Sequence, residues 1–425
     1  MQSGISFKQI TSLITIALIS GGFALRSDGL LMLGLVAGSV FIVSWLWMRY
    51  ALTGIEYQRT FSETRAFVGE TITWSLIITN RKWLPLTRLR LTDYLSAQLT
   101  LTDFDVRPSG LPNLVQVRQY LSLSWYEQVR RTYHLACTQR GIYDFRPASV
   151  QTGDPFHFIT LDAEVGQVDR LIVYPEVKPI TGLVLPEKEP FGTKVADRRL
   201  LQDPIYMRGV RPYQPEDDLR FVHWKATART QELQTKIFEP TTVANLVLFT
   251  NIATFANTWE GIDPVLMERL VSVTASICAQ AVEKRLVVGL SANGALPLSD
   301  QPLRVLPNRN PQQLTRLLEA LAAVRGIASA KFDTFLLQES AKLPWGATLM
   351  VITAVVTPEI EAVLLRLKEA GRKLVLLSLA DEAPRWIDGI VIYHLPGRTM
   401  DESFHFAPVG GVSPVQSYPP EATPA

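Results

Sequence analysis

The chain has 425 residues, of which 47% are hydrophobic and 19% are charged, a composition that excludes global disorder and predicts two or three folded units. The formal net charge of +2 predicts no broad basic surface, and therefore no nucleic-acid partner. The two cysteines, Cys137 and Cys278, offer no pair spacing and are interpreted as buried free thiols. The five histidines lack the i,i+4 or cysteine-paired spacing of zinc sites, so they predict neither a metal site nor a cofactor.

Two uncharged apolar runs open the chain, Gln9–Leu25 and Leu30–Met48, with the polar turn Arg26-Ser27-Asp28 between them. As helices of 17 and 19 residues they would be about 25–29 Å long, close to the ~30 Å hydrocarbon core of a bilayer. Residues 1–50 are therefore predicted to form a transmembrane helical hairpin. The alternative is a signal peptide followed by one anchor, although the basic segment before the first run is thin and the cleavage site is poor.

The charges that flank the apolar runs predict the orientation of the hairpin. Arg49, Arg59 and Arg65 follow the second run, whereas the loop between the runs holds one arginine offset by one aspartate. Because basic residues collect on the cytoplasmic side of membrane helices, the sequence predicts a two-pass protein of the inner (plasma) membrane with its soluble domains in the cytoplasm.

Small and aromatic residues of the second run predict its contacts. Gly34 and Gly38 form a small-xxx-small face on which the hairpin partner or another chain can pack closely. Trp45, Trp47 and Tyr50 form an aromatic edge of the kind found at membrane–water interfaces.

Residues 55–175 show short alternating segments separated by turn residues, without a helical run. Strands at this spacing predict an antiparallel β-sandwich. The expected strands are Thr71–Asn80, Leu86–Tyr94, Val115–Leu123, Val129–Cys137 and Leu171–Tyr174.

Residues 176–240 are expected to form a proline-rich connector that ends in a charged segment. Residues 241–395 then alternate strand and helix patterns, which predicts an open, mostly parallel α/β sheet with helices on both faces. The expected elements are the strands Val243–Phe249, Leu286–Leu290, Thr348–Thr353, Lys373–Leu379 and the edge strand Ile390–Tyr393, with the helices Pro264–Arg285, Pro311–Val324 and Pro358–Ala370. Residues 396–425 lose apolar periodicity and are predicted to be a disordered tail.

The most charged and aromatic segment is Tyr213–Arg229, which reads YQPEDDLRFVHWKATAR. Three interpretations remain open for it. In the first, it is a structural corner in which the acidic and basic side chains neutralise each other and Trp224 is a core anchor. In the second, it is an anion site in which arginine guanidinium groups bind a carboxylate or phosphate. In the third, it is a hydrolytic site with Asp217 or Asp218 as the base. The cations available for anion contacts are Arg208, Arg211, Arg220, Lys225 and Arg229.

The expected ligand edge of the α/β sheet offers little chemistry. Ligands of open α/β sheets bind outside the carboxyl ends of the strands. Neither G-x-x-x-x-G-K-[ST], G-x-G-x-x-G nor G-x-S-x-G occurs in the chain. The loop after the first strand supplies only neutral groups (Thr250, Asn251 and Thr254), whereas a hard cation requires carboxylates. The sequence therefore predicts no metal site, no cofactor and no enzyme activity at this edge.

The charged segment closely resembles the signature of the bacterial domain-of-unknown-function 58 family, approximately Y-x-P-G-D-D-x-R-x-I-x-W-x-x-[ST]-A-R. Glu216 stands where the family usually has glycine, and Val222 where it has isoleucine. The residues that match are Tyr213, Pro215, Asp217, Asp218, Arg220, Trp224, Ala228 and Arg229.

Three shorter segments add to the resemblance. Arg140-Gly141-Ile142-Tyr143 resembles the family's R-G-x-Y turn, and Ile172-Val173-Tyr174-Pro175 resembles its V-Y-P strand end. Asp154-Pro155-Phe156 resembles its D-P-F, with His157 in place of the common glycine.

The resemblance implies a membrane-anchored protein with a β-sandwich and a von Willebrand factor type A-like α/β domain. Such relatives are grouped with MoxR-type AAA+ ATPases and are thought to act in assembly or maturation of protein complexes. The D-x-S-x-S metal motif common in type A domains is absent from Thr250–Thr254. The sequence thus predicts a membrane-tethered protein-interaction module that works with a MoxR-type ATPase on unknown client proteins. The alternatives are a ligand-binding or hydrolytic site on Tyr213–Arg229, and a structural envelope protein whose β-sandwich binds a membrane partner.

Overall fold

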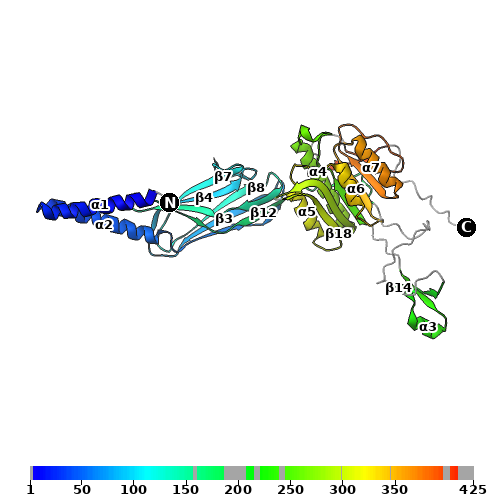
Figure 1. Ribbon diagram of the computed structural model, residues 1–425, viewed down its shortest axis with the longest axis horizontal. Coiled ribbons are helices and arrows are strands. Elements are labelled where there is room, and N and C mark those ends of the chain that lie inside the picture. Colours follow the sequence, from blue (N-terminus) through cyan, green and yellow to red (C-terminus); the bar gives the residue numbers. More distant parts are fainter. Residues whose placement is uncertain are drawn as a thin grey trace. The chain divides into compact units, whose positions relative to one another are not determined.

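The computed structural model describes residues 3–156, 160–185, 207–214, 221–238, 245–297, 299–344, 346–395 and 403–409. The chain divides into two compact units, the first spanning Met1–Glu176 and the second beginning at Val177 (Figure 1). The first unit contains the apolar hairpin and the β-rich segment, and the second contains the α/β sheet.

The two apolar runs form the antiparallel helices α1 (Ser3–Ala24) and α2 (Asp28–Ala51). The helices approach closely because α2 presents glycine to α1: a Cβ atom on Gly34 would lie 2.7 Å from Cγ1 of Ile19, and one on Gly38 would lie 3.3 Å from Cγ2 of Thr15. The small-residue face therefore packs against the hairpin partner, one of the two partners that the sequence left open.

The last two turns of α2 leave the hairpin and pack against the β-rich segment. Ser44, Met48 and Ala51 are buried at i, i+4 and i+7, so they form one stripe of the helix. Trp47 also packs against the core of the β-rich segment. The expected aromatic edge is therefore split, because Trp47 faces protein whereas Trp45 is exposed.

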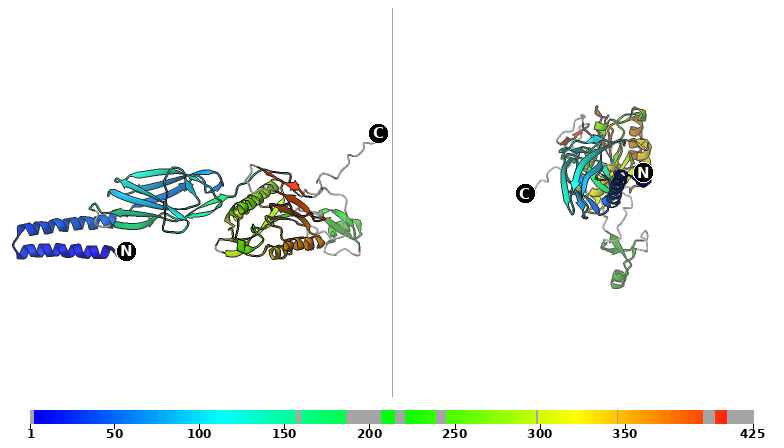
Figure 2. Two further views of the ribbon diagram at one scale, coloured as in Figure 1. Left: turned by 90° about the horizontal axis from the view of Figure 1, so that it is seen from above. Right: turned by 90° about the vertical axis from the view of Figure 1, so that its left-hand side faces the viewer.

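Residues 55–176 fold into a mostly antiparallel β-sandwich, as the alternating pattern predicted (Figure 2). The sheets have the orders β1-β3-β8-β5, β11-β10-β4-β7-β6 and β2-β12-β9. The strands are β1 (Ile55–Phe61), β2 (Arg65–Phe67), β3 (Thr71–Asn80), β4 (Leu86–Ser96), β5 (Thr100–Leu101), β6 (Arg107–Pro108), β7 (Leu114–Leu123), β8 (Gln128–Ala136), β9 (Gly141–Phe145), β10 (Ala148–Gly153), β11 (Thr160–Val165) and β12 (Asp169–Tyr174).

The core of the sandwich contains a buried tryptophan and explains one of the short motifs. Trp74 is fully buried against Tyr133 and Phe145, with ring centroids 5.6 and 6.1 Å away. In the Arg-Gly-x-Tyr turn, the ring of Tyr143 folds back over Gly141, where an added Cβ atom would lie 3.0 Å from Cζ, and its hydroxyl donates to the Gln139 carbonyl at 2.8 Å. This turn requires glycine because a larger residue would displace the tyrosine ring.

The second unit is built on a seven-stranded sheet with the order β18-β17-β16-β19-β20-β21-β23. β16, β17, β19, β20 and β21 are parallel, and β18 and β23 are antiparallel edge strands. The elements of this unit are β13 (Ile180–Thr181), β14 (Met207–Pro212), α3 (Trp224–Thr230), β15 (Gln234–Phe238), β16 (Asn245–Thr250), η2 (Thr258–Glu260), α4 (Pro264–Glu283), β17 (Val287–Leu296), β18 (Ser299–Asn308), α5 (Gln313–Ala323), α6 (Phe332–Ser340), β19 (Thr348–Thr353), α7 (Pro358–Glu369), β20 (Lys373–Ser378), β21 (Val391–His394), β22 (Phe404–His405) and β23 (Ala407–Pro408).

The continuous apolar runs of the central strands are explained by burial on both faces. Val247 and Phe249 of β16 belong to a cluster with residues of α6 and α7. Thr250, on the opposite face of the strand, contacts Thr274 of α4 through hydroxyl oxygens 3.1 Å apart. Helices therefore cover both faces, as expected, and α4 and α7 lie on opposite sides of the sheet (Figure 2).

Caps fix the ends of two of these helices as the sequence suggested. The Asp263 carboxylate accepts from the Val265 and Leu266 amides at the start of α4, and Pro264 occupies the first helical position. Gly371 follows α7 with φ +80°, the left-handed conformation that ends a helix.

Three boundaries predicted from the sequence are wrong. The connector at 176–240 contains β13, which pairs with β22 of the supposed tail, and Phe404 is fully buried. The tail therefore does not begin at residue 396, since residues 403–409 belong to the second unit. The strand at 390–393 is not an edge, because β23 pairs with β21. These elements are two residues long, and so short a strand carries no periodicity to detect.

Candidate functional site

The carboxyl ends of β16 and β19 meet at the centre of the α/β sheet, where the order of the strands reverses. This is the position at which open α/β sheets bind ligands. Asn251 and Thr353 lie here, and their side chains are 2% and 0% exposed. Asn293, from the neighbouring strand β17, joins them and is also buried.

The three side chains bond to one another and to the loop backbone. The Asn251 amide donates to Oγ1 of Thr353 at 3.1 Å, and the Asn293 amide donates to Oδ1 of Asn251 at 3.0 Å. The Ile252 amide donates to Oδ1 of Asn293 at 2.9 Å, and the Ala253 amide donates to Oδ1 of Asn251 at 3.1 Å. Both asparagine carbonyl oxygens are therefore used inside the protein.

Two hydroxyl groups at this edge are also paired. The Asp263 amide donates to Oγ1 of Thr254 at 2.7 Å, which joins this loop to the start of α4. Oγ1 of Thr353 donates to the Val355 carbonyl at 2.7 Å. We refer to Thr250, Asn251, Thr254, Asn293 and Thr353 as the switch-point network. It fills the usual ligand position with neutral side chains. Asn251, Asn293 and Thr353 bond to one another, whereas Thr250 pairs with Thr274 and Thr254 with the Asp263 amide.

The sequence singled out Thr250, Asn251 and Thr254 at this edge and placed Thr353 at the end of a neighbouring strand, but it missed Asn293. The available signal was an asparagine inside a strand, a position where asparagine is depleted unless its side chain has a fixed partner. The network lies where a metal site of such a fold would lie. It offers only hydroxyl and amide groups, whereas divalent hard cations prefer carboxylate oxygens. Among the described residues, no group of three or more His, Cys, Asp or Glu side chains could hold a metal ion.

Addition of Mg²⁺ is expected to leave the melting temperature unchanged. A ligand that binds only the folded state raises the melting temperature, but the oxygens of the switch-point network already accept hydrogen bonds from buried donors. Thermal unfolding with and without millimolar MgCl₂, with NaCl matched for ionic strength, measures this. A clear rise that is specific to Mg²⁺ would contradict a sealed network.

The signature segment forms part of a small hairpin. β14 pairs with β15, and α3 lies between them. Pro215, Asp217, Asp218 and Arg220 lie outside the described residues, as does Glu216, and so does the side chain of Arg208. The structure therefore does not place the carboxylates of the proposed hydrolytic or anion site.

The described part of this segment is explained by local structure. Nδ1 of His223 accepts from the Ala226 amide at 2.9 Å and caps α3. Oγ1 of Thr227 accepts from the Gln234 amide at 3.0 Å and fixes the turn into β15. Tyr213 takes part through its backbone, since its amide donates to the Leu233 carbonyl at 2.8 Å. These contacts hold the hairpin closed.

The exposure of Trp224 on α3 contradicts the expectation that this residue anchors a core. Trp224 is 69% exposed, so it is not a core anchor. Lys225, Ala228 and Arg229 are exposed as well. Arg211, on β14, donates to the Pro212 carbonyl at 3.2 Å. A seven-residue helix has two turns and cannot bury a large side chain by itself, which is why Trp224 lies on its surface.

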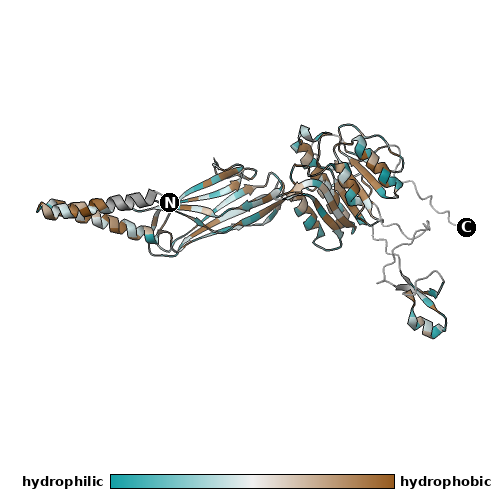
Figure 3. Cartoon of the chain, in the orientation of Figure 1, coloured by the Kyte–Doolittle hydropathy of each residue, from teal (hydrophilic) through white to brown (hydrophobic). Residues whose placement is uncertain are grey.

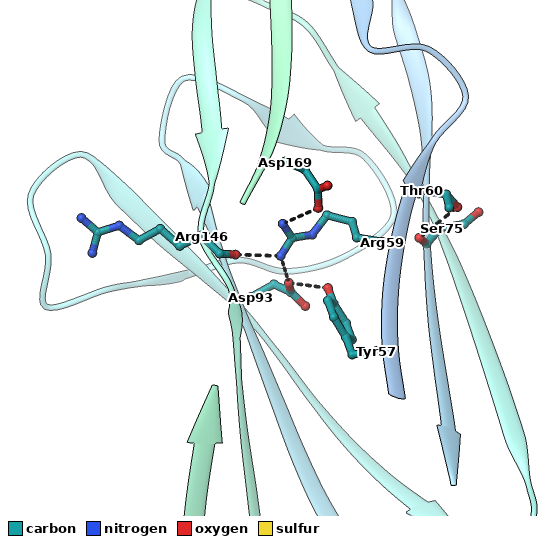
Figure 4. Close-up of polar contacts among 7 residues, drawn as sticks. All are labelled: Tyr57, Arg59, Thr60, Ser75, Asp93, Arg146 and Asp169. Carbon is teal, nitrogen blue, oxygen red and sulfur yellow. Dashed lines mark hydrogen bonds and ion pairs between the residues drawn. The ribbon is translucent and has the colours of Figure 1, made fainter. Parts of the chain in front are cut away.

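A second buried polar cluster lies inside the β-sandwich, where the sequence predicted no site (Figure 4). Nη2 of Arg59 lies 2.7 Å from Oδ1 of Asp93, and Nη1 lies 3.2 Å from Oδ2 of Asp169. The Tyr57 hydroxyl donates to Oδ1 of Asp93 at 2.7 Å, and Nη2 of Arg59 also donates to the Arg146 carbonyl at 2.9 Å. The arginine thus joins β1, β4 and the start of β12.

The electrostatics of this cluster follow from its burial. The side chains of Arg59 and Asp93 are 1% and 0% exposed. Burial raises the pKa of the Tyr57 phenol far above its usual range, so the hydroxyl stays a donor. Burial also raises the pKa of Asp93, and the Arg59 charge and the Tyr57 hydrogen bond oppose that rise. Because the cluster is closed to substrate, we assign it a structural role.

Fold and site together define a mixed α+β protein with an apolar helical hairpin, a β-sandwich and an α/β sheet whose ligand position is filled by its own side chains. The model of the family "Protein of unknown function DUF58" matches residues 209–404. The match covers the signature segment, so the resemblance drawn from the sequence is confirmed for residues 209–404.

One curated relative and several solved structures are similar to the chain. The uncharacterized protein YeaD of Bacillus subtilis (strain 168) is 25% identical over 338 residues, which cover 78% of this chain and 77% of the relative. The CARDB domain of the PF1109 protein from Pyrococcus furiosus matches with a TM-score of 0.19 and 14% identity, covering 28% of this chain and 84% of that one. A cohesin module from a Clostridium perfringens family 33 glycoside hydrolase matches with a TM-score of 0.21 and 12% identity, covering 28% and 97%. At such TM-scores these similarities carry no argument about function.

Proposed function

We propose that the chain is a membrane-tethered protein-interaction module that works with a MoxR-type AAA+ ATPase in the assembly or maturation of protein complexes. The proposal has two parts, the tether and the interaction surface, and each is supported by different residues.

The tether is supported by α1 and α2, which carry exposed large apolar side chains such as Leu13, Ile16 and Leu33. Figure 3 shows hydrophobic residues along much of both helices. Two described helices are long and apolar enough to cross a bilayer, α2 and α4. The apolar stretch of α4 is mostly buried, so α4 is a core helix of the α/β unit, whereas the apolar stretch of α2 is mostly exposed. Leu35, for example, is 66% exposed. A hairpin with this surface is stable in lipid and not in water.

The proposed orientation has the two soluble units in the cytoplasm, at the inner (plasma) membrane. One of the charges behind this prediction has to be reassigned, because Arg59 is buried with Asp93 and is not a free flanking charge. The exposed Arg49 and Arg65 still follow the hairpin. The loop between α1 and α2 holds one arginine and one aspartate, so the basic excess remains on the side of the sandwich.

The interaction surface is supported by apolar side chains beside the sealed switch-point network. Trp259, in the loop between β16 and α4, is 81% exposed. Val265, in the first turn of α4, and Ile327, whose carbonyl accepts from the Ala295 amide at the end of β17, are also exposed. Tryptophan is enriched among residues that dominate protein interfaces. An exposed tryptophan at an edge without catalytic groups favours a protein partner over a small substrate, and this is the observation that carries the proposal.

The identity of the partner follows from the family resemblance, in which such proteins are grouped with MoxR-type ATPases. An open, mostly parallel sheet with helices on both faces also supports a von Willebrand factor type A-like fold for the second unit. In this chain the type A surface would act without its metal, since Asn251 occupies the loop where the metal motif would supply aspartate.

Photo-crosslinking in intact membranes tests the proposal. A photoreactive phenylalanine at position 259 is expected to give an adduct that contains a MoxR-type AAA+ ATPase. The matched control is position 306, because Leu306 is 75% exposed on β18 of the same unit but lies at the edge of the sheet. Adducts that lack the ATPase, or that are identical at positions 259 and 306, would count against the proposed surface.

A further inference from the structure

One end of the β-sandwich carries exposed aromatic side chains on two adjacent turns. Trp83 lies in the turn between β3 and β4 and is 72% exposed, and Trp125 and Tyr126 lie in the turn between β7 and β8 and are each 69% exposed. Three large aromatic residues on neighbouring turns of a β-sandwich require an explanation, because such residues normally contribute to a core or an interface. We refer to these three residues as the aromatic turns.

The two turns are held together by hydrogen bonds. The Tyr126 amide donates to the Lys82 carbonyl at 3.2 Å. The Asn80 side-chain amide donates to the Ser124 carbonyl at 2.8 Å and to the Leu84 carbonyl at 3.0 Å. Asn80 is fully buried, so it fixes both turns from below.

The same turns hold the end of α2. Nζ of Lys82 donates to the Ala51 carbonyl, the last residue of α2, and to the Thr53 carbonyl at 2.7 Å. The Arg81 amide donates to the Gly54 carbonyl at 2.8 Å. The aromatic turns therefore lie at the end of the sandwich where α2 enters it.

The length of α2 sets the depth of this end relative to a bilayer. Its 24 residues span about 36 Å, or about 34 Å along the membrane normal at a tilt of about 20°. The hydrocarbon core is about 30 Å thick, and the headgroup regions bring the bilayer to about 40–45 Å. A helix that starts at one boundary of the hydrocarbon core thus ends in the opposite headgroup layer, and Ala51 lies there.

The contact between α2 and the sandwich keeps the last two turns of α2 outside the hydrocarbon core, so the end of α2 lies at the membrane surface. The Ser44 hydroxyl donates to Oδ2 of Asp154 at 2.9 Å, and both side chains are buried. Ser44 precedes Ala51 by seven residues, or about 10 Å of helix. The Asp-Pro-Phe turn therefore contacts α2 at a point closer to the hairpin tip than Ala51. Phe156 of this turn is exposed. The sandwich packs directly against the last two turns of α2, without a linker between the helix and the sandwich.

The backbone of one turn adds an independent observation. Tyr126 has φ +53°, in the left-handed region that favours glycine or asparagine. A bulky aromatic residue in this conformation is unfavourable, and such residues persist mainly where they serve a function. A tyrosine side chain therefore stands at this position although glycine or asparagine would form the turn with less strain.

We infer that the aromatic turns, Trp83, Trp125 and Tyr126, insert into the headgroup layer of the bilayer and fix the β-sandwich against the membrane surface. Tryptophan and tyrosine favour this layer because one part of the ring is apolar and the other forms hydrogen bonds. The Arg81 guanidinium in the same turn as Trp83 is paired with Glu56, with Nη2 and Oε2 2.8 Å apart, so the aromatic rings alone carry the inference. The inference rests on the proposed membrane tether and adds that the first unit is held on the surface by its own side chains.

Nitroxide labels on the full chain in nanodiscs of phosphatidylcholine and phosphatidylglycerol test this inference. The single-cysteine sites are Trp125→Cys, Leu35→Cys on α2 and Trp259→Cys in the second unit, and the native Cys137 and Cys278 are buried. Collisions with oxygen report lipid, and collisions with a water-soluble nickel chelate report solvent. We expect the oxygen-to-nickel collision ratio at position 125 to lie between the solvent value at 259 and the hydrocarbon value at 35, and to exceed the ratio at 259 several-fold.

The outcomes separate this inference from the tether on which it rests. A label at 125 that resembles the one at 259, while the label at 35 is in lipid, overturns the inference and leaves the tether intact. A label at 35 in solvent overturns both. A label at Trp83→Cys provides a second site in the other turn, so that the result does not depend on the backbone of the β7–β8 turn.

Discussion

Replacing Arg59 by methionine lowers the free energy of unfolding of the β-sandwich by about 3–5 kcal/mol, because it leaves the Asp93 carboxylate buried without its cation. Methionine fills most of the arginine volume, so the loss is electrostatic and not a cavity effect. The change is also expected to increase hydrogen exchange in β3 and β4 selectively, since the cluster joins β1 to the opposite sheet.

Two further variants make this prediction specific. Arg81→Met removes a cation from an exposed pair, in which Nη2 of Arg81 lies 2.8 Å from Oε2 of Glu56, and should cost only about 0–1 kcal/mol. Combining Arg59→Met with Asp93→Leu should recover most of the lost stability, because a buried ion pair can be replaced by apolar residues of similar volume. Denaturant unfolding in detergent measures all three. Equal losses for Arg59→Met and Arg81→Met would contradict the structural role of the cluster.

The second large effect is expected at Asn293. Asn293→Leu should lower the stability of the α/β unit by about 2–4 kcal/mol, because each buried polar group that is left without a partner costs about 1–3 kcal/mol. The Ile252 amide loses its acceptor, and Oδ1 of Asn251 loses one of its two donors. Leucine has a similar volume, which separates the hydrogen-bond loss from a packing defect.

Asn257→Ala is the matched control for Asn293. Its side-chain amide donates to Oε1 of Glu260 at 2.6 Å on the surface of the same unit, so its loss should stay within about 0.5 kcal/mol. Hydrogen exchange should increase around β16 and β19 in the Asn293 variant only. If the two asparagine variants were equally stable, the switch-point network would not be the rigid seal that we describe.

Some of the longer elements were predicted with their observed bounds, whereas the strands β1, β9, β10 and β11 and the helix α6, each at least five residues long, were not predicted. The strand Thr71–Asn80 has the bounds of β3, and Thr348–Thr353 those of β19, because alternation and continuous burial leave clear signals over this length. The antiparallel edge strand β18 was missed because its residues, from Ser299 to Asn308, include two prolines and several polar groups that read as a loop.

The sites were less predictable than the fold. The sequence placed Asn251 and Thr353 at one edge because parallel strands end together, but the hydrogen bonds of Asn293 depend on how β17 lies beside β16. The Arg59 cluster gave no signal at all, since it joins residues 34 and 110 positions apart. Trp224 was assigned to a core because of its size, whereas its exposure is set by a helix of only seven residues.

The central claim is that the exposed edge of the α/β unit meets an ATPase at the membrane. Crosslinking from position 259 in intact membranes tests it most directly, because Trp259 lies beside the sealed network and a physical adduct identifies the partner. We expect an adduct with a MoxR-type AAA+ ATPase from position 259 and none from position 306. Adducts from position 259 that contain no ATPase, in membranes where that ATPase is present, would contradict it.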